Sequence, residues 1–231
     1  PANAGVMRPI EVKVPEGSLL SAQFPAPTGG YTETILRMID VIFSAAAQAA
    51  PDRIVANAYG TINALSIAGK RSNGQPWVMF SFYGGGHGGS PEGDGLNHGN
   101  APISTATLPP MEIMGATYEI EVLEENGAEA FLFGERGRFA PKGVAGGAEA
   151  ALNVFSYASG DGFAHPPLAS KMRGIKLAQG QSVILETPGG GGYGKAEDRE
   201  PNAVAQDVAR GLVSAQAADA AYGPGWREYA S

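Results

Sequence analysis

The sequence contains no cysteine among its 231 residues. Disulfides, thiolate nucleophiles, zinc–thiolate sites and iron–sulfur clusters are therefore excluded, and the cysteine-free chain suits a cytoplasmic protein. Basic residues are few, since 16 Lys and Arg face 23 Asp and Glu for a net charge of −7. Such a chain lacks the positive field that holds a phosphate backbone, so we expect no nucleic-acid partner. No apolar run approaches the roughly 20 residues of a membrane span, so we expect no membrane partner either.

Charged residues are also scarce, at 17% of the chain against roughly 25% in an average soluble protein. Glycine and proline are abundant instead. The 34 glycines and 17 prolines make up about 22% of the chain, against about 12% in average usage. The glycines show no three-residue period, which excludes collagen, so the excess predicts many turns and irregular loops. Together, these features predict large faces that other subunits cover.

The hydrophobic pattern predicts an α+β fold that is rich in β-structure, with many short strands and glycine loops in one unit over residues 1–231. Strands are predicted where apolar residues alternate or cluster briefly, over 8–14, 77–83, 111–118, 119–123, 128–133, 152–157 and 182–186. Two amphipathic helices are predicted over about 32–50 and 202–222, where apolar residues recur at the helical period. Pro201 is well placed to begin the second helix.

The chain begins at Pro1 without an initiator methionine and without a signal-peptide pattern. This beginning predicts an internal fragment, a processed subunit or a chain whose first half is missing.

The loop over residues 84–99 is the first candidate for a functional site. It contains eight glycines, which let a backbone approach a ligand closely, and two of the three histidines of the chain. Histidine with carboxylate is a usual set of ligands for a divalent metal, and it also suits acid–base chemistry. The catalytic candidates are therefore His87, Asp94 and His98, and the candidates for substrate binding are Gly85, Gly86 and Gly88. The alternative is that both histidines only bind backbone groups within a tight glycine loop.

A second glycine run, over residues 187–195, follows a predicted strand and invites comparison with a phosphate loop. The spacing does not fit, because Lys195 is followed by Ala196 and the next helix begins only after Pro201. A turn that needs positive φ, or close packing of backbone, is the favoured interpretation.

The densest basic cluster consists of Arg136, Arg138 and Lys142. These residues could pair with an anionic substrate, or they could form a salt-bridged surface loop or a contact between subunits.

Several segments in this order resemble the C-terminal half of the hydantoinase B / oxoprolinase B subunit family, which also supplies subunits of acetone and acetophenone carboxylases. The resemblance spans nearly the whole chain. Its most specific mark is Thr-Pro-Gly-Gly-Gly-Gly-Tyr-Gly at 187–194, and the other segments are 3–5, 8–12, 15–20, 60–63, 83–95 and 199–214.

The resemblance implies part of an ATP-dependent hydrolase that opens a cyclic amide such as oxoproline, a hydantoin or a lactam. A hydantoinase A-type ATPase subunit with an actin-like fold would phosphorylate the amide oxygen, and a metal-bound hydroxide in the B-type subunit would then attack. The family's metal ligands are expected in the N-terminal half of the B-type subunit, outside this chain. We therefore expect a hetero-oligomer of the two, no metal ligand among these residues, and an isolated chain that neither binds ATP nor hydrolyses amides.

Two alternatives remain open at this level: part of an ATP-dependent ketone carboxylase subunit, and a non-catalytic assembly domain. The sequence also departs from the family pattern, because Tyr118 runs directly into Glu119 where the family has a glycine- and arginine-rich stretch. This departure predicts a missing segment between residues 118 and 119.

Overall fold

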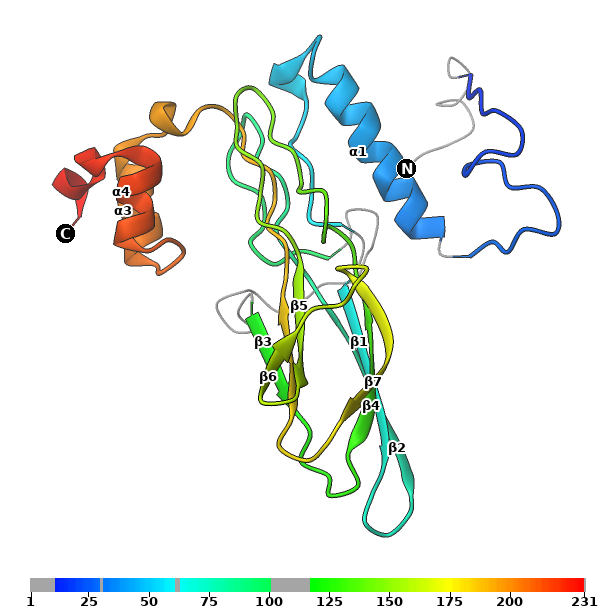
Figure 1. The fold of residues 1–231 in the computed structure, drawn as a ribbon. Coiled ribbons are helices and arrows are strands. Elements are labelled where there is room, and N and C mark those ends of the chain that lie inside the picture. The colour runs from blue at the N-terminus through cyan, green and yellow to red at the C-terminus, as the bar shows by residue number, and fades with distance from the viewer. Residues whose placement is uncertain (1–10, 30, 61–62, 101–116, 231) are drawn as a thin grey trace.

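A computed structural model describes residues 11–29, 31–60, 63–100 and 117–230. Two antiparallel sheets of four strands face each other in a sandwich, with a long helix and a small helical unit on opposite sides of its upper end (Figure 1). The predicted α+β class is confirmed. The predicted strand over 8–14 is wrong where it can be judged, because residues 11–14 form no strand. Residues 8–10 and 111–116 lie outside the described residues.

The first sheet has the strand order β2-β1-β4-β7, and every neighbouring pair is antiparallel. Its strands are β1 (Asn63–Lys70), β2 (Pro76–Tyr83), β4 (Ala128–Phe133) and β7 (Lys171–Leu177). β1 and β2 form a hairpin whose turn contains Gly74 at a φ of 84°, a conformation that favours glycine. The sequence did not predict β1 or β7.

The second sheet has the order β3-β8-β5-β6, again with antiparallel neighbours. Its strands are β3 (Thr117–Glu121), β8 (Ser182–Glu186), β5 (Val154–Ser159) and β6 (Gly162–Ala164).

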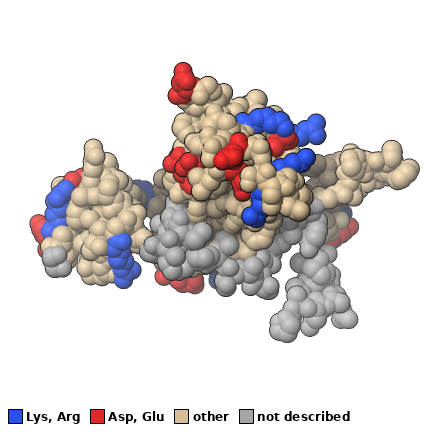
Figure 2. Space-filling model, turned by 90° about the horizontal axis from the view of Figure 1, so that it is seen from below, with Lys and Arg blue, Asp and Glu red and all other residues tan. Residues whose placement is uncertain are grey.

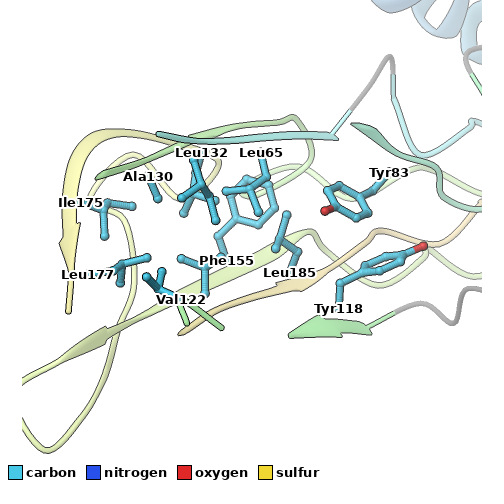
Figure 3. Packing of buried hydrophobic residues seen from close by; sticks show 12 residues of the cluster. Leu65, Tyr83, Tyr118, Val122, Ala130, Leu132, Phe155, Ile175, Leu177 and Leu185 are labelled. Carbon is cyan, nitrogen blue, oxygen red and sulfur yellow. The ribbon is translucent and has the colours of Figure 1, made fainter. Parts of the chain in front are cut away.

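The core lies between the two sheets and consists of the side chains that alternate toward the interior of each strand (Figure 3). Full burial of one such side chain stabilises the fold by about 1.5–3 kcal/mol. The largest contributors from the two sheets are Leu65, Ile67, Leu132, Ile175, Phe155, Val183 and Leu185, with Tyr83 and Tyr118 packed against each other at the upper end.

Helix α1 (Tyr31–Ala46) is shorter than the predicted 32–50. Pro51 begins the short helix η1 (Pro51–Arg53), and Ala50 before it has non-helical backbone angles, with φ −144° and ψ 65°. The predicted helix over 202–222 is two helices, α3 (Pro201–Ala209) and α4 (Ala215–Tyr222). Gly211 between them has a φ of 74°, and the Ser214 hydroxyl caps α4 by accepting from the Ala217 amide at 3.2 Å.

α3, α4 and η3 (Pro224–Tyr229) form the helical unit, which has a core of its own made of Val204, Ala205, Ala218 and Trp226. The short helix η2 (Ala196–Asp198) leads into this unit from the sandwich (Figure 1).

Among the described residues, no helix is both long and apolar enough to cross a membrane. Seen from below, acidic and basic side chains are both present over the lower end of the sandwich (Figure 2).

Candidate functional site

Four loop segments meet at the upper end of the sandwich: residues 54–60, 84–100, 134–153 and 187–194. We call this region the glycine junction. Main-chain hydrogen bonds of 2.9 Å join its segments, from Ala56 to Gly89, from Gly89 to Gly191 and from Gly191 to Asn57. Backbone hydrogen bonds thus bring three of these four loops side by side.

The glycines of the junction are required by close contact between backbones. A Cβ atom would lie 1.9 Å from the carbonyl oxygen of His87 if built on Gly190, and 1.9 Å from that of Ala56 if built on Gly88. Real Cβ atoms essentially never come within 3.0 Å of another heavy atom. Side chains are thus excluded at these positions whatever the backbone conformation.

The run over 187–195 shows the close packing that the sequence favoured over a phosphate loop. Its amides donate within the chain, from Gly189 to Ala151 and from Gly192 to Ala148. Gly194 likewise donates to Val144. A phosphate loop uses such N–H groups to bind its ligand. Here they already donate to backbone carbonyl oxygens, so they are not available to a phosphate group.

A pocket of about 320 Å³ opens beside the junction and has both polar and apolar walls. His87 and Asp94 line it together with Val55, Ala58 and Leu96. Its volume lies at the lower end of the range of about 300–1,000 Å³ that is typical of small-molecule sites. The structure thus brings two of the three predicted catalytic residues into one pocket.

The tautomer of His87 follows from its hydrogen bond. Its Nε2 lies 2.7 Å from the carbonyl oxygen of Asn100, which can only accept, so Nε2 carries the proton. In the neutral ring, Nδ1 is then the acceptor nitrogen. The ring lies nearly parallel to that of Tyr59, with 6.3 Å between centroids, and burial raises the pKa of the Tyr59 hydroxyl. His87 is thereby held in one orientation with a nitrogen able to accept a proton.

His98 occupies a different environment from His87. Its Nε2 accepts from the Gly84 amide at 3.2 Å, and the Tyr118 hydroxyl lies 2.6 Å from the same nitrogen and donates to it. With Nε2 as the acceptor, the ring proton lies on Nδ1, and the imidazole is buried. Burial raises the pKa of Tyr118 to about 12, which keeps that hydroxyl a donor. His98 links the sandwich to the glycine junction and does not line the pocket.

Asp94 is held by the guanidinium group of Arg199, which donates to both carboxylate oxygens at 2.8 and 2.7 Å. Arg199 also donates to Asp207 of α3 at 2.6 Å, so it joins the pocket wall to the helical unit. The hydrogen bonds from Arg199 lower the pKa of Asp94 below its ordinary value, so the carboxylate stays ionised and is a poor base.

These contacts bear on whether the candidate residues fit a metal ion. The Nε2 atom of His98 and both oxygens of Asp94 already have partners. Within the ranges that the structure describes, no group of three or more His, Asp or Glu side chains could hold a metal ion. The described residues therefore do not fit a resident metal, and we derive no step through one.

The three glycine candidates lie against the chain itself. A Cβ on Gly85 would lie 2.5 Å from the Tyr59 ring, and one on Gly86 would lie 2.3 Å from the Gly190 nitrogen. Gly88 also lines the pocket. A role of these glycines in substrate binding stays a prediction.

The sequence did not reveal a half-buried ionic cluster that ties α1 to the junction. Arg136 donates to Asp40 of α1 and to the carbonyl oxygen of Ala58 at 2.8 Å, and Arg37 pairs with Asp40 and with Glu135. Burial raises the pKa of Asp40, while the two arginines oppose that shift. For Arg136, the salt-bridged interpretation of the basic cluster is thus the one observed.

Comparison with known proteins finds relatives of similar sequence. A 26% identical relative is the putative B-type subunit of a D-/L-hydantoinase from a Pseudomonas species, matched over 96% of this chain and 42% of its own length. The caprolactamase subunit beta of Pseudomonas jessenii is 29% identical and is matched over 96% of this chain and 44% of its own. The chain therefore spans about two fifths of the length of these curated relatives, both of which are named as subunits.

The second alignment covers 263 positions, which exceeds the 231 residues of the chain, so that relative carries at least 32 residues within the matched region that this chain lacks. A solved structure of the ATP-dependent caprolactamase from Pseudomonas jessenii covers 96% of this chain and 44% of its own with a TM-score of 0.68. At 24% identity, this likeness shows the fold. The model of the family described as Hydantoinase B/oxoprolinase matches residues 1–126 and 114–196. The resemblance in the sequence is thus confirmed, and the chain belongs to the Hydantoinase B/oxoprolinase family.

Proposed function

We propose that this chain is part of the B-type subunit of an ATP-dependent amidohydrolase that opens a cyclic amide such as oxoproline, a hydantoin or a lactam. The observation that carries the proposal is the family match over most of the chain, together with relatives named for hydantoin and caprolactam. Because the chain spans about two fifths of those relatives, the activity belongs to an assembly of this chain with further polypeptide.

Amide resonance makes direct attack by water slow, and phosphorylation turns the amide oxygen into a leaving group. In this proposal, an A-type ATPase subunit transfers the phosphoryl group from ATP to the oxygen. ATP and a divalent metal are held outside this chain, by that ATPase and by the remainder of the B-type subunit.

The pocket beside the junction suits the substrate part of this chemistry. Val55 and Leu96 give it apolar walls that can contact the methylene groups of a small ring. The free acceptor nitrogen of His87 can take a proton from an attacking water molecule, which is general-base catalysis. Asp94, kept ionised by Arg199, fixes one wall and is not the proton acceptor.

The test is an assay of the chain assembled with the remainder of a B-type subunit and an A-type ATPase subunit. We expect ATP-dependent ring opening of at least one of 5-oxoproline, hydantoin and caprolactam, with release of ADP and phosphate. The isolated chain should show neither this activity nor tight ATP binding by calorimetry. ATP-dependent carboxylation of acetone without amide hydrolysis would instead indicate a ketone carboxylase, and inactivity of the complete assembly on every substrate would indicate an assembly domain.

A further inference from the structure

The outer face of the first sheet is apolar over β2 and β1 and over the Phe131–Phe133 end of β4. Leu65 and Ile67 of β1 point into the core, so their neighbours Ala64, Ser66 and Ala68 face the other side of the sheet. The strand registers place these three small residues between two rows of larger ones, with Val78, Phe80 and Phe82 on β2 and with Phe131 and Phe133 on β4. We call these eight residues the aromatic face. Glu129 of β4 lies opposite Ala68 and ends the apolar row.

The large side chains of the aromatic face are exposed. Phe80 is 61% exposed and Val78 is 70% exposed, while Phe82, Phe131 and Phe133 are between 38% and 42% exposed. Because β1 lies between β2 and β4, the two rows are about 9–10 Å apart, which is two spacings of a sheet. Ala64, Ser66 and Ala68 leave the strip between the rows low, so another polypeptide can place side chains there.

The opposite face of the sandwich carries more charge, although Ile184 of β8 and the exposed Phe163 of β6 also lie on it. Thr117, Glu119 and Glu121 on β3 and Glu186 on β8 are exposed on it, and the Ser182 hydroxyl donates to Glu119 at 2.8 Å. Antiparallel sheets with one face in water usually carry polar residues there. The two outer faces of one sandwich thus differ in chemistry, and a contiguous exposed apolar patch marks an interaction surface.

We propose that the aromatic face is the docking surface for the part of a complete B-type subunit that lies outside the matched region. Relatives matched over 96% of this chain are matched over only 42–44% of their own length, so more than half of their length remains to be placed against this chain.

The positive charge of Lys171, at the edge of the aromatic face, indicates which charge the partner carries there. Lys171 of β7 pairs with Phe133, and its Nζ lies 4.6 Å from the centroid of that ring. Lys171 is exposed, whereas Lys176 further along the strand is paired with Glu129. The partner segment is therefore apolar where it meets the phenylalanines and acidic where it meets Lys171.

The absence of cysteine allows a direct test, because a single introduced thiol is unique in the chain. Ser66→Cys places a thiol in the middle of the aromatic face, and Ser159→Cys places one at an exposed position on β5 of the other sheet. Both substitutions are nearly isosteric, so they form a matched pair. The rate of maleimide labelling is measured for the 231-residue chain alone and after mixing with a polypeptide made of the unmatched part of the Pseudomonas jessenii caprolactamase subunit beta.

We expect the added polypeptide to slow labelling of the Ser66→Cys variant at least tenfold and to leave the Ser159→Cys variant unchanged. Adding Phe80→Asp to the Ser66→Cys variant should restore rapid labelling in the mixture. Unslowed labelling of the Ser66→Cys variant in the mixture would overturn the proposal. The proposal would also be overturned if labelling of the Ser66→Cys variant slowed without the added polypeptide as the chain concentration rose. A second copy of the chain would then be the occupant of the aromatic face. Labelling requires no turnover, so this test can fail while the proposed amide hydrolysis stands, and the reverse also holds.

Discussion

Replacing Gly190 by alanine tests whether the glycine junction depends on contact between backbones. The added methyl group would lie 1.9 Å from the carbonyl oxygen of His87, and the other nearby atoms also belong to the backbone. No side-chain rotation can relieve such an overlap. The run over 187–194 must therefore move away from the loop over 84–100 by at least about 1 Å to restore ordinary contact distances.

A shift of that size lengthens three hydrogen bonds beyond useful range. They run from Gly86 to Pro188 at 3.0 Å, from Gly89 to Gly191 at 2.9 Å and from Gly191 to Asn57 at 2.9 Å. Each contributes about 1 kcal/mol net. Alanine restricts the unfolded chain and returns about 0.4–1 kcal/mol. We expect a net loss of about 2 kcal/mol in the free energy of unfolding, or a melting temperature about 4–8 °C lower for a protein of this size.

The assay is urea unfolding followed by tryptophan fluorescence, with Gly162→Ala as the matched control. Gly162 lies in β6, and a Cβ atom built there meets nothing within 4 Å. The control should stay within about 0.5 kcal/mol of the parent chain, as surface substitutions usually do. If Gly190→Ala is as stable as Gly162→Ala, the backbones of the junction are not in contact and the argument fails.

Three further predictions concern single side chains. His87→Ala should lower turnover of the assembled enzyme at least tenfold, about 1.4 kcal/mol of barrier, with little change in melting temperature; unchanged activity per folded molecule would exclude the catalytic role. Arg136→Met should cost about 2 kcal/mol of stability at pH 7, because the half-buried Asp40 carboxylate loses one charged hydrogen-bond donor and keeps Arg37 as its cation. Burial already raises the pKa of Asp40 and losing a cation raises it further, so protonation of Asp40 should reduce this cost as the pH falls, and urea unfolding at pH 7 and at acidic pH checks the sign. Arg199→Lys should speed limited proteolysis between the junction and α3 several-fold, because Arg199 bonds to Asp207 of α3. The fluorescence of Trp226 should stay unchanged, since the helical unit has a core of its own. Equal cleavage rates in the variant and the parent chain would show that Arg199 does not hold the unit.

The strands that the sequence predicted well are those whose apolar residues form compact runs. Residues 128–133 and 182–186 match β4 and β8, because both segments are short apolar runs in which alternate side chains, such as Ala130 and Leu132 or Val183 and Leu185, are buried in the core. β1 was missed because its outward positions hold alanine and serine, which weakens the contrast between its two faces. β7 was missed because Gly174 has a φ of 74° and the register shifts there, so the two-residue period is interrupted.

The candidate site was predicted only in part, for reasons of distance along the chain. Local sequence singled out His87 and Asp94, which do line one pocket. Arg199 lies 105 residues beyond Asp94, so no local pattern could reveal that it occupies both oxygens of the carboxylate. The hydroxyl that holds His98 likewise comes from a distant residue, Tyr118 of β3 in the second sheet. His98 itself lies in the loop over 84–100, which follows β2 of the first sheet. Long-range pairing of this kind depends on the fold, and short motifs carry no information about it.

The packing of the glycine junction also limits what its sequence signature can tell about related proteins. Gly86, Gly88, Gly190 and Gly191 are fixed by the thickness of a polypeptide backbone, and that constraint is the same whether or not a reaction takes place nearby. A relative that had lost its chemistry would still have to keep these glycines in order to fold. When activity is transferred from one relative to another, the glycine runs therefore identify the architecture alone. Under the proposed role of His87 as general base, the residue at that position would be the more informative guide, and the His87→Ala assay decides whether it can serve as one.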